Sequence, residues 1–345
     1  DLKWINFFEG RSNNIYIVFR ERSSYRIDYS YFENKKITII GAIGDFSIFR
    51  PLSTIKSYLF IRSVIKKYKV DIFHIFYAEP NALWAIFKNS FNCKIALTTR
   101  GTDILVTISQ FGMYNKIQDY YVYPLYRFAL KNFDFITCTS KSQKDKIEQI
   151  TNHKISPYII RTGINFSLIK RTEINNNISI DGEYILFPRN MKPLYNHELA
   201  ISSLRFLNKK IKSSYTFVFL DKNSEDSAYI KTIEGLMGQF TDIKFLFKKR
   251  LDEKSFCHLL KSARLVVITA KSDGSPVTAM QAMAFGIPVI LPPLKYDDDI
   301  FGEWIYKLAS WDDKDLANKI TAVLSDIFES KKIKAHKAIR QFADY

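Results

Sequence analysis

Cysteine is rare in this sequence, and its distribution argues against two kinds of stabilisation. The three cysteines among 345 residues are far apart, odd in number and set in apolar segments. This pattern fits neither a disulfide framework nor the paired ligands of a zinc site. We therefore expect Cys93, Cys138 and Cys257 to be reduced core residues of a cytoplasmic protein.

Long apolar runs are missing as well. No stretch approaches the roughly 18 residues that would span a bilayer, and the start does not read as a signal peptide. The chain begins with Asp1 rather than methionine, so the sequence leaves open whether a targeting signal precedes it. A composition of 47% hydrophobic and 25% charged residues is typical of a soluble globular protein, and 345 residues exceed one ordinary core, so we expect two domains.

Acidic residues are scarce relative to basic ones, above all in the first half. The net charge is +16; residues 1–170 hold 25 Lys and Arg against 13 Asp and Glu, whereas residues 171–345 hold 26 against 22. A basic first half indicates an anionic partner, such as membrane headgroups, a phosphorylated lipid or nucleic acid. A solvated basic surface without any partner would have the same composition.

The aromatic stretch Tyr120–Phe128 lies in this basic half, close to Lys116 and Lys131. Tyrosines beside lysines are typical of a membrane interface, but the same stretch would suit burial between helices. It would also suit single-stranded nucleic acid. Since nothing else resembles a nucleic-acid module, we predict no nucleic-acid partner and an anionic membrane surface instead.

Strand-like and helix-like segments alternate along nearly the whole chain. Strands are predicted at 15–19, 36–40, 71–76, 94–98, 133–138, 184–188, 215–220, 243–247, 265–269 and 288–291, with helices at 53–67, 81–88, 114–130, 141–150, 196–209, 227–240, 253–261 and 276–285. Repeated βα units with buried strands predict an α/β protein with parallel sheets covered on both faces.

An asparagine-rich stretch, Arg171–Gly182, interrupts the alternation and is the best linker in the chain. We therefore predict two doubly wound Rossmann-like domains, at 1–165 and 183–345, joined by a linker at 166–182. Ligands of such sheets bind beyond the carboxyl ends of the strands, so the active site is expected in a cleft between the domains.

The segment Ser272–Ile290 is the most informative in the chain. Ser275 stands where an N-cap belongs and Pro276 at the first helical position, an apolar helix follows, and Gly286 ends it before a buried strand. A helix that begins at a turn of small residues can hold a phosphate with its free N–H groups and its dipole.

This segment resembles the donor-binding signature of the family 4 retaining glycosyltransferases of the GT-B fold. The signature has two acidic residues eight positions apart, here Asp273 and Gln281, followed by a run that Gln-Ala-Met-Ala-Phe-Gly-Ile-Pro-Val matches closely. Four further segments resemble the family's motifs in its order: Asp71–Tyr77 with His74, Thr99–Asp103, Ser140 after a strand, and Arg161–Asn165. The resemblance spans about residues 70–325.

The resemblance implies roles for residues of the second domain. Asp273 would contact the donor sugar, and Gln281, which replaces the usual glutamate, would hydrogen-bond the ribose without adding charge. The helix start would hold the diphosphate; it consists of Gly274, Ser275, Pro276, Val277 and Thr278. The alternative makes Asp273 a turn residue and Gln281 a helix residue that faces solvent.

The family also places an arginine and a lysine after the first strand of the second domain, where they neutralise the diphosphate and the departing nucleotide. Arg189 and Lys192 lie near these places and are the predicted donor-binding cations. A strict alignment puts Asn190 and Tyr195 on the two basic positions instead.

In the first domain the resemblance implies an acceptor-side or phosphate-binding group made of His74, Arg100, Gly101 and Thr102, with Asp103 as a catalytic polar residue. The alternative for Asp103 is an N-cap of the next segment, and His74 would equally suit a structural place at a strand end. Relatives begin with a strand that precedes the region matching Asp1–Ile5, so the first strand is expected to be missing here. The last helix is a candidate to cross back to the first domain.

The clusters Asp297–Asp299 and Asp312–Asp315 raise the question of a carboxylate-bound metal ion. Their places in a loop and at a helix start favour solvated caps. No Walker loop, paired zinc ligands or nucleophile elbow is present. We expect neither a metal nor a cofactor, the substrate being a nucleotide-diphosphate sugar.

The resemblance implies a metal-independent retaining hexosyltransferase that moves a sugar from a nucleotide-sugar donor to an acceptor hydroxyl. The acceptor is expected to be a lipid-linked oligosaccharide in bacterial surface polysaccharide synthesis, at the inner face of the cytoplasmic membrane. Two alternatives stay open: a noncatalytic nucleotide-sugar-binding homologue, and a nucleotide-sugar epimerase or hydrolase of the same fold.

Overall fold

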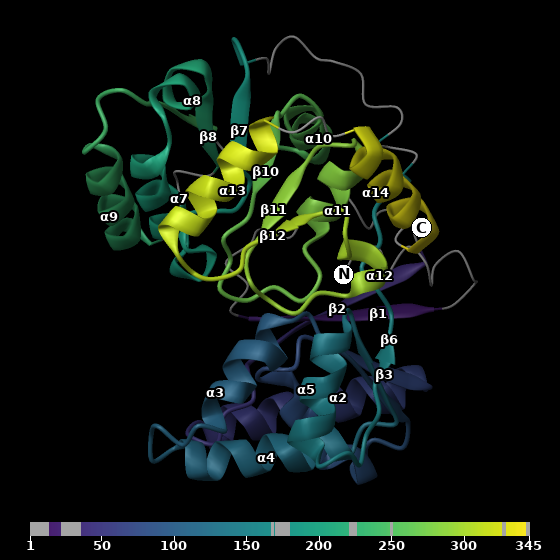
Figure 1. The fold of residues 1–345 in the computed structure, drawn as a ribbon. Coiled ribbons are helices and arrows are strands. Elements are labelled where there is room, and N and C mark those ends of the chain that lie inside the picture. The colour runs from purple at the N-terminus through teal and green to yellow at the C-terminus, as the bar shows by residue number, and fades with distance from the viewer. Residues whose placement is uncertain are drawn as a thin grey trace. The chain divides into compact units, whose positions relative to one another are not determined.

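The structure is a computed structural model that describes residues 14–21, 36–166, 169, 180–220, 226–248, 251–325 and 329–342 (Figure 1). It divides into two compact units. Unit 1 comprises Asp1–Thr139 and Gln143–Ile160, and unit 2 comprises Ser140–Ser142 and Arg161–Tyr345. Most of the predicted linker and the segment Asp1–Ile5 lie outside the described residues.

Unit 1 is built on parallel strands. A four-stranded sheet has the order β3-β4-β5-β6, and two further strands, β1 and β2, pair with each other. The strands are β1 (Ile15–Arg20), β2 (Ile37–Ile43), β3 (Ile72–Phe76), β4 (Lys94–Thr98), β5 (Phe135–Cys138) and β6 (Tyr158–Ile159). The intervening helices are α2 (Pro51–Tyr68), η2 (Asn81–Ser90), η3 (Asp103–Ile108), α3 (Ser109–Phe111), α4 (Asp119–Lys131) and α5 (Lys141–Thr151).

The predicted helix at 114–130 was wrong at its start. It begins at Asp119, because Tyr114 adopts a left-handed conformation with φ 52° and the Asp119 carboxylate accepts a hydrogen bond from the Lys116 backbone N–H at 2.9 Å. The segment η3 is wound as a π-helix, which no sequence pattern indicated.

Unit 2 holds a six-stranded parallel sheet with the order β12-β11-β10-β7-β8-β9. Its strands are β7 (Tyr184–Phe187), β8 (Thr216–Leu220), β9 (Lys244–Lys248), β10 (Leu265–Val267), β11 (Val289–Leu291) and β12 (Tyr306–Lys307). Its helices are η5 (Pro193–Tyr195), α7 (His197–Ser203), η6 (Leu204–Phe206), α8 (Lys209–Ser214), α9 (Ser227–Met237), α10 (Glu253–Lys261), α11 (Val277–Ala284), α12 (Asp298–Phe301), α13 (Asp313–Ser325) and α14 (Glu329–Phe342).

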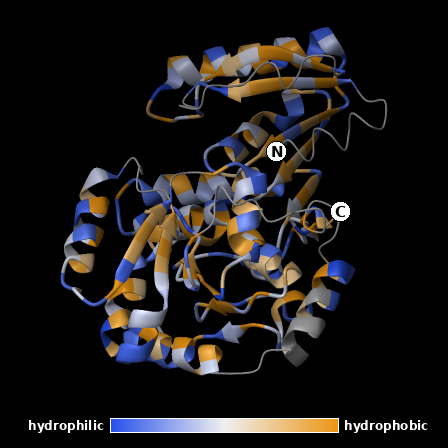
Figure 2. Ribbon diagram, turned by 90° about the horizontal axis from the view of Figure 1, so that it is seen from above, coloured by the Kyte–Doolittle hydropathy of each residue, from blue (hydrophilic) through white to orange (hydrophobic). Residues whose placement is uncertain are grey.

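Helices cover both faces of this sheet. Successive strand residues alternate between two cores: Ile185 and Val267 pack with α7, α9 and α13, whereas Leu186 and Val266 pack with α10, α11 and α14. Strands buried on both faces read as continuous apolar runs, which is why many strand ribbons are orange in Figure 2 while the helices alternate blue and orange. The predicted α/β class with parallel sheets is confirmed.

Candidate functional site

The strand order of unit 2 creates a place for a ligand. The chain starts the sheet at β7, proceeds outward through β8 and β9, and then returns to the other side of β7 with β10. The loops after β7 and β10 therefore diverge at a topological switch point, where open parallel sheets bind their ligands. Arg189 lies two residues beyond β7, and Asp273 lies in the loop between β10 and α11.

Arg189 and Asp273 form an ion pair across this switch point. A terminal nitrogen of the guanidinium contacts one carboxylate oxygen of Asp273, and the other oxygen accepts a hydrogen bond from the Ser275 backbone N–H at 3.3 Å. Arg189 also stacks over the Tyr195 ring at 5.4 Å. Burial raises the pKa of Asp273, while Arg189 and the Ser275 N–H oppose that rise.

Beside the pair lies a cavity of about 290 Å³. Its lining combines polar groups from Arg189, Asn190, Tyr195 and Thr278 with apolar ones from Leu220, Leu251 and Phe256. A small number of polar groups in an apolar wall is typical of a site for a small molecule. Both Asn190 and Tyr195, the positions of the strict alignment, line it, whereas the Lys192 side chain is exposed.

The helix α11 points its start toward this region, with one correction to its boundary. It begins at Val277 with Pro276 as the N-cap residue, so the prediction of Ser275 as N-cap was wrong. The reason is the extended conformation of Pro276, with ψ 96°. Gly274, Pro276 and Thr278 are buried, and Ser275, Val277 and Gln281 are half-buried, so Gln281 is not a fully solvated residue.

Two residues of this site escaped the sequence analysis. The Tyr296 hydroxyl is buried and has no hydrogen-bond partner among the described residues, and burial together with the charge of Asp273 raises its pKa. The His197 Nε2 lies 3.1 Å from the Arg189 carbonyl oxygen and so helps to hold the backbone of that residue. Neither residue belongs to a spacing pattern; only the place of His197 at the start of the helix after Tyr195 was a signal.

In unit 1 the predicted residue Asp103 is fully buried and saturated with hydrogen bonds. Its carboxylate accepts backbone N–H groups of Ala78 at 2.7 Å, Gly101 at 2.9 Å, Ile104 at 3.0 Å and Arg100 at 3.1 Å. These contacts join the loop after β3 to the turn after β4. They are the contacts of a residue that positions a turn, and they leave no carboxylate oxygen exposed; the N-cap position of η3 belongs to Thr102, so Asp103 is not an N-cap.

The other predicted residues of unit 1 surround this turn. The His74 Nε2 lies 2.8 Å from Thr98 Oγ1, and its ring stacks on Phe76 at 4.2 Å; burial and the charge of Arg100 lower its pKa to about 4. The Arg100 guanidinium lies over the Phe76 ring, 5.7 Å from the ring centre. The Thr102 hydroxyl lies 3.2 Å from the Tyr77 hydroxyl.

Gly101 connects these residues in a turn that suits glycine. Its φ of 117° is a conformation that L side chains rarely adopt, and a Cβ there would lie 3.5 Å from the Gln143 side-chain nitrogen. The structure thus brings Arg100, Thr102 and Asp103 together beyond the carboxyl ends of β3 and β4. His74 does not belong to this turn, because it lies within β3 itself.

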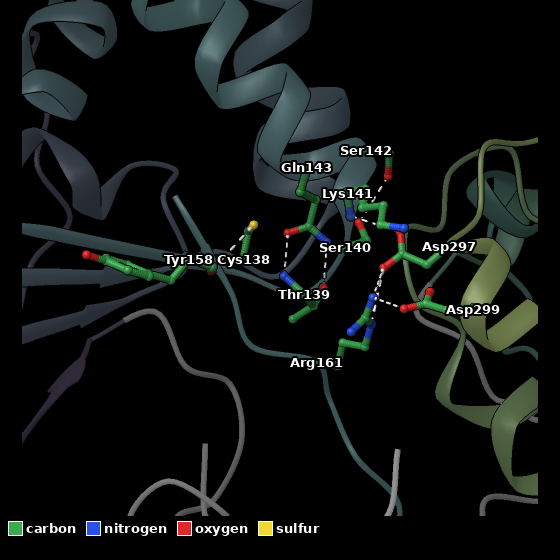
Figure 3. Close-up of polar contacts among 10 residues, drawn as sticks. All are labelled: Cys138, Thr139, Ser140, Lys141, Ser142, Gln143, Tyr158, Arg161, Asp297 and Asp299. Atoms are coloured by element: carbon green, nitrogen blue, oxygen red, sulfur yellow. Dashed lines mark hydrogen bonds and ion pairs between the residues drawn. The ribbon is translucent and has the colours of Figure 1, made fainter. Parts of the chain in front are cut away.

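Asp297 does not fit the prediction of a solvated cap, which was wrong for this residue. It is 3% exposed and lies within unit 2 between the Lys141 backbone N–H, which donates at 2.9 Å, and Arg161, whose Nε donates at 3.3 Å (Figure 3). Arg161 also pairs with Asp299 at 2.7 Å. By contrast, Asp312 and Asp315 accept backbone N–H groups in exposed positions, as caps do.

Two further classes of site were sought in the described part of the chain. Within it, no group of three or more His, Cys, Asp or Glu side chains could hold a metal ion. No helix of this part is long and apolar enough to cross a membrane. The aromatic stretch of α4 is divided: Tyr126 is buried, whereas Tyr120, Tyr121 and Phe128 are more than half exposed.

Comparisons with known proteins agree with this geometry. The family described as glycosyl transferases group 1 matches residues 170–341, and the family described as glycosyl transferase 4-like matches residues 2–140. No curated protein matches the chain in sequence.

Solved structures share the fold. A glycosyltransferase from Rickettsia africae superposes with a TM-score of 0.75 at 16% identity, covering 99% of this chain and 89% of that one. Sucrose-phosphate synthase from Thermosynechococcus elongatus does so with a TM-score of 0.72, 16% identity and the same coverage. HepE from Anabaena, solved with UDP, reaches 0.69 at 14% identity, covering 91% and 85%. With its parallel sheets and both family matches, the chain belongs to the family 4-like glycosyltransferases of the GT-B fold.

Proposed function

We propose that the protein is a retaining glycosyltransferase that binds a nucleotide-diphosphate sugar in unit 2. The observation that carries this proposal is the Arg189–Asp273 pair at the switch point, beside the start of α11 and a cavity of about 290 Å³. A guanidinium and a helix N-terminus are the groups that hold a diphosphate. HepE, one of the similar structures, was solved with UDP and with UDP-glucose, which supports this class of donor.

Catalysis in this proposal rests on charge. As the glycosidic bond to the diphosphate breaks, negative charge develops on the departing oxygen, and Arg189 together with the N–H groups of α11 stabilises it. The Asp273 carboxylate holds Arg189 in place and is the group that accepts a hydrogen bond from a sugar hydroxyl in this proposal. These residues supply the positive charge that the leaving group needs, so the proposed reaction is metal-independent.

Unit 1 takes the acceptor in this proposal. Arg100 and Thr102 present a charge and a hydroxyl beyond the strand ends, on a turn that Asp103 positions. The acceptor is a lipid-linked oligosaccharide of bacterial surface polysaccharide synthesis, at the inner face of the cytoplasmic membrane. The excess of basic residues in the first half of the sequence supports an anionic, membrane-borne acceptor.

A panel of nucleotide sugars tests the donor. The donor should raise the melting temperature of the protein, because a ligand that binds only the folded state stabilises it. Nucleotide release that requires added membrane lipid extract supports transfer; release without acceptor indicates a hydrolase, interconversion of donors an epimerase, and binding without turnover a noncatalytic protein. If no nucleotide sugar shifts the melting temperature, the proposal is wrong.

The variant Asp273→Ala sharpens the test. We expect turnover to fall by at least about 100-fold, since Arg189 loses its anchor and the sugar loses a polar contact. Asp298→Ala is the matched control, because Asp298 is exposed and lies outside the cavity. Near-normal turnover of a folded Asp273→Ala protein would remove Asp273 from the site.

A further inference from the structure

Helix α2 of unit 1 exposes large apolar side chains on one face. Leu52, Ile55 and Leu59 are 83%, 52% and 54% exposed, and Phe49 in the preceding turn is 70% exposed. The three helix positions are three and four residues apart, so they form a single stripe along the outer side of the helix. We call this stripe, together with Phe49, the outer face of α2.

Polar contacts fix this orientation. Thr54 is buried, and its hydroxyl donates to the Ser47 carbonyl at 2.9 Å and accepts from the Ser47 N–H at 3.0 Å. A Cβ on Gly44 would lie only 2.8 Å from Ser53 Oγ and 3.5 Å from Ser57 Oγ, so small groups meet here. The first turns of α2 therefore pack inward through serine and threonine.

The second half of the helix buries the same face, but with apolar instead of polar side chains. There Ile61, Val64 and Ile65 are buried, so apolar side chains face the core as in an ordinary surface helix. A helix that only covered a sheet would keep its apolar residues on one side throughout. The inversion in the first half leaves a leucine and isoleucine stripe that the fold itself does not use.

The charge around this stripe has one sign. Residues 46–70 contain six Lys and Arg and no Asp or Glu. All six basic side chains are exposed, and Arg62 and Lys66 continue the outer face beyond Leu59. Among the residues that the structure describes, no carboxylate forms an ion pair with any of the six. The outer face is thus apolar at its start and basic at its end.

We propose that the outer face of α2 docks unit 1 on an anionic lipid bilayer. Phe49 and the three aliphatic residues enter the boundary between headgroups and acyl chains, and the basic side chains lie among anionic headgroups. The proposal deepens the membrane-borne acceptor proposed above by naming the surface that reaches the lipid.

The charges favour a bilayer over other occupants. A second copy of the chain would set six cations against six, and single-stranded nucleic acid would call for stacking rings, where the helix offers aliphatic side chains. A bilayer with anionic lipids satisfies both halves of the face at once. An acidic protein partner would also match the charge and is separated from lipid by the experiment below.

Co-sedimentation of the full chain with vesicles tests the proposal. Vesicles of phosphatidylcholine with roughly 30% phosphatidylglycerol should bind the protein, and pure phosphatidylcholine should bind it at least about tenfold more weakly. Binding should weaken further in high salt, since headgroup contacts are screened. Equal binding to both lipids, or no binding to either, would overturn the proposal.

The variant Leu52→Gln/Ile55→Gln/Leu59→Gln should bind anionic vesicles at least about tenfold more weakly, while its melting temperature stays near that of the parent because the replaced side chains are exposed. Phe206→Gln/Trp311→Gln in unit 2 is the matched control, with parent side chains 44% and 43% exposed, and should bind like the parent. Parent-like binding by the triple variant would overturn the proposal.

A further variant locates the surface within unit 1. Ile117 and Tyr121 near α4 are 83% and 66% exposed, so Ile117→Gln/Tyr121→Gln removes a comparable apolar area. It should retain most of the binding; loss of binding here but not in the α2 variant would place the contact on α4 and overturn the assignment. None of these assays contains a nucleotide sugar. A failure to bind vesicles therefore does not affect the test of the donor, and a failure to bind nucleotide sugars does not affect the test of membrane docking.

Discussion

At the scale of single residues, the Arg189–Asp273 pair sets the charge of the candidate donor site. Arg189 uses one end of its guanidinium for Asp273 and lies over the Tyr195 ring, while its Nε is buried with no partner in the part of the chain that the structure describes. A buried donor of this kind is costly unless a ligand satisfies it. Arg189 is thus held in place, and its Nε–H is available to donate a hydrogen bond to a ligand.

Arg189→Gln should weaken binding of the nucleoside diphosphate that gives the largest thermal shift by about tenfold or more, because a charge-assisted hydrogen bond is lost. Binding of the corresponding monophosphate should fall less. Titration calorimetry with both ligands measures this. Lys244→Gln, an exposed lysine of β9, is the control. Equal losses for both ligands would contradict a diphosphate contact by Arg189.

Asp103→Asn separates a positioning residue from a catalytic one. The carboxylate accepts four backbone N–H groups, and an amide would turn a donor toward some of them. We expect the free energy of unfolding to fall by about 3 kcal/mol or more, as several buried donors lose their acceptor. Denaturant unfolding measures this, with Asp298→Asn as control. Unchanged stability with lost turnover would instead restore a direct catalytic role.

The residue types of the site followed from its motif, but their contacts did not. The pattern around Asp273 pointed to a phosphate-binding helix start, and Arg189 was selected despite its imperfect register. Arg189 and Asp273 lie in loops 84 residues apart in sequence, and Tyr296 belongs to a third loop that the fold brings close to both. No spacing rule connects such positions.

At the scale of elements, α11 resembles the family's signature closely but departs from it at Gln281. Gln281 lies one turn beyond Val277 and is half-buried. It offers an amide where the resemblance expects a carboxylate. An amide hydrogen-bonds hydroxyls as acceptor and donor, so in the proposed function ribose binding survives the exchange but its strength changes.

Gln281→Glu tests this position. We expect it to change the affinity for the donor nucleotide several-fold and to leave the affinity for the 2′-deoxy analogue nearly unchanged, because a carboxylate accepts ribose hydroxyls more strongly than an amide. Thermal shift titrations with both nucleotides provide the readout. A matched change for both would show that Gln281 does not meet the ribose.

Most elements were predicted within a few residues, because buried parallel strands are continuous apolar runs between polar turns. The strand β4 and the helix α10 have the predicted bounds. Local conformations that depend on tertiary contacts were missed. The expected helix at 81–88 is a 3₁₀ segment, and η3 forms around the buried Asp103, whose four acceptor bonds no pattern reveals.

At the scale of the whole molecule, each unit contains a histidine whose pKa is lowered by burial. His74 in β3 and His197 at the start of α7 both have their pKa lowered to about 4, chiefly by burial. An unfolded chain restores their ordinary value near 6.5. Both units therefore carry the same dependence on acid.

We expect stability to decline as pH falls from 6.5 toward 4. In this range the unfolded state binds protons that the folded state does not, so stability is fully present above 6.5 and lost below it, by up to about 3 kcal/mol per histidine. His74→Gln/His197→Gln should flatten the decline between pH 6.5 and 5, as followed by denaturant unfolding. An unchanged slope would show that the two histidines do not cause it.

The sequence predicted two α/β halves but not how their strands are ordered. The return of β10 to the side of β7 depends on which sheet edge the chain revisits, and local patterns contain no information about that. This order brings the loops of Arg189 and Asp273 together. The topology of unit 2 thus had to be observed before the site could be assembled.

The pairing of Arg189 with Asp273 has a consequence for selectivity. Because Arg189 already has an anionic partner, a ligand can bind Arg189 only by displacing the Asp273 carboxylate or by sharing the guanidinium with it. A small anion of single charge offers Arg189 no more than Asp273 does. A diphosphate brings several charges and meets the start of α11 at the same time. In the proposed reaction, the ion pair therefore discriminates against the abundant simple anions that surround the protein, before any sugar is recognised.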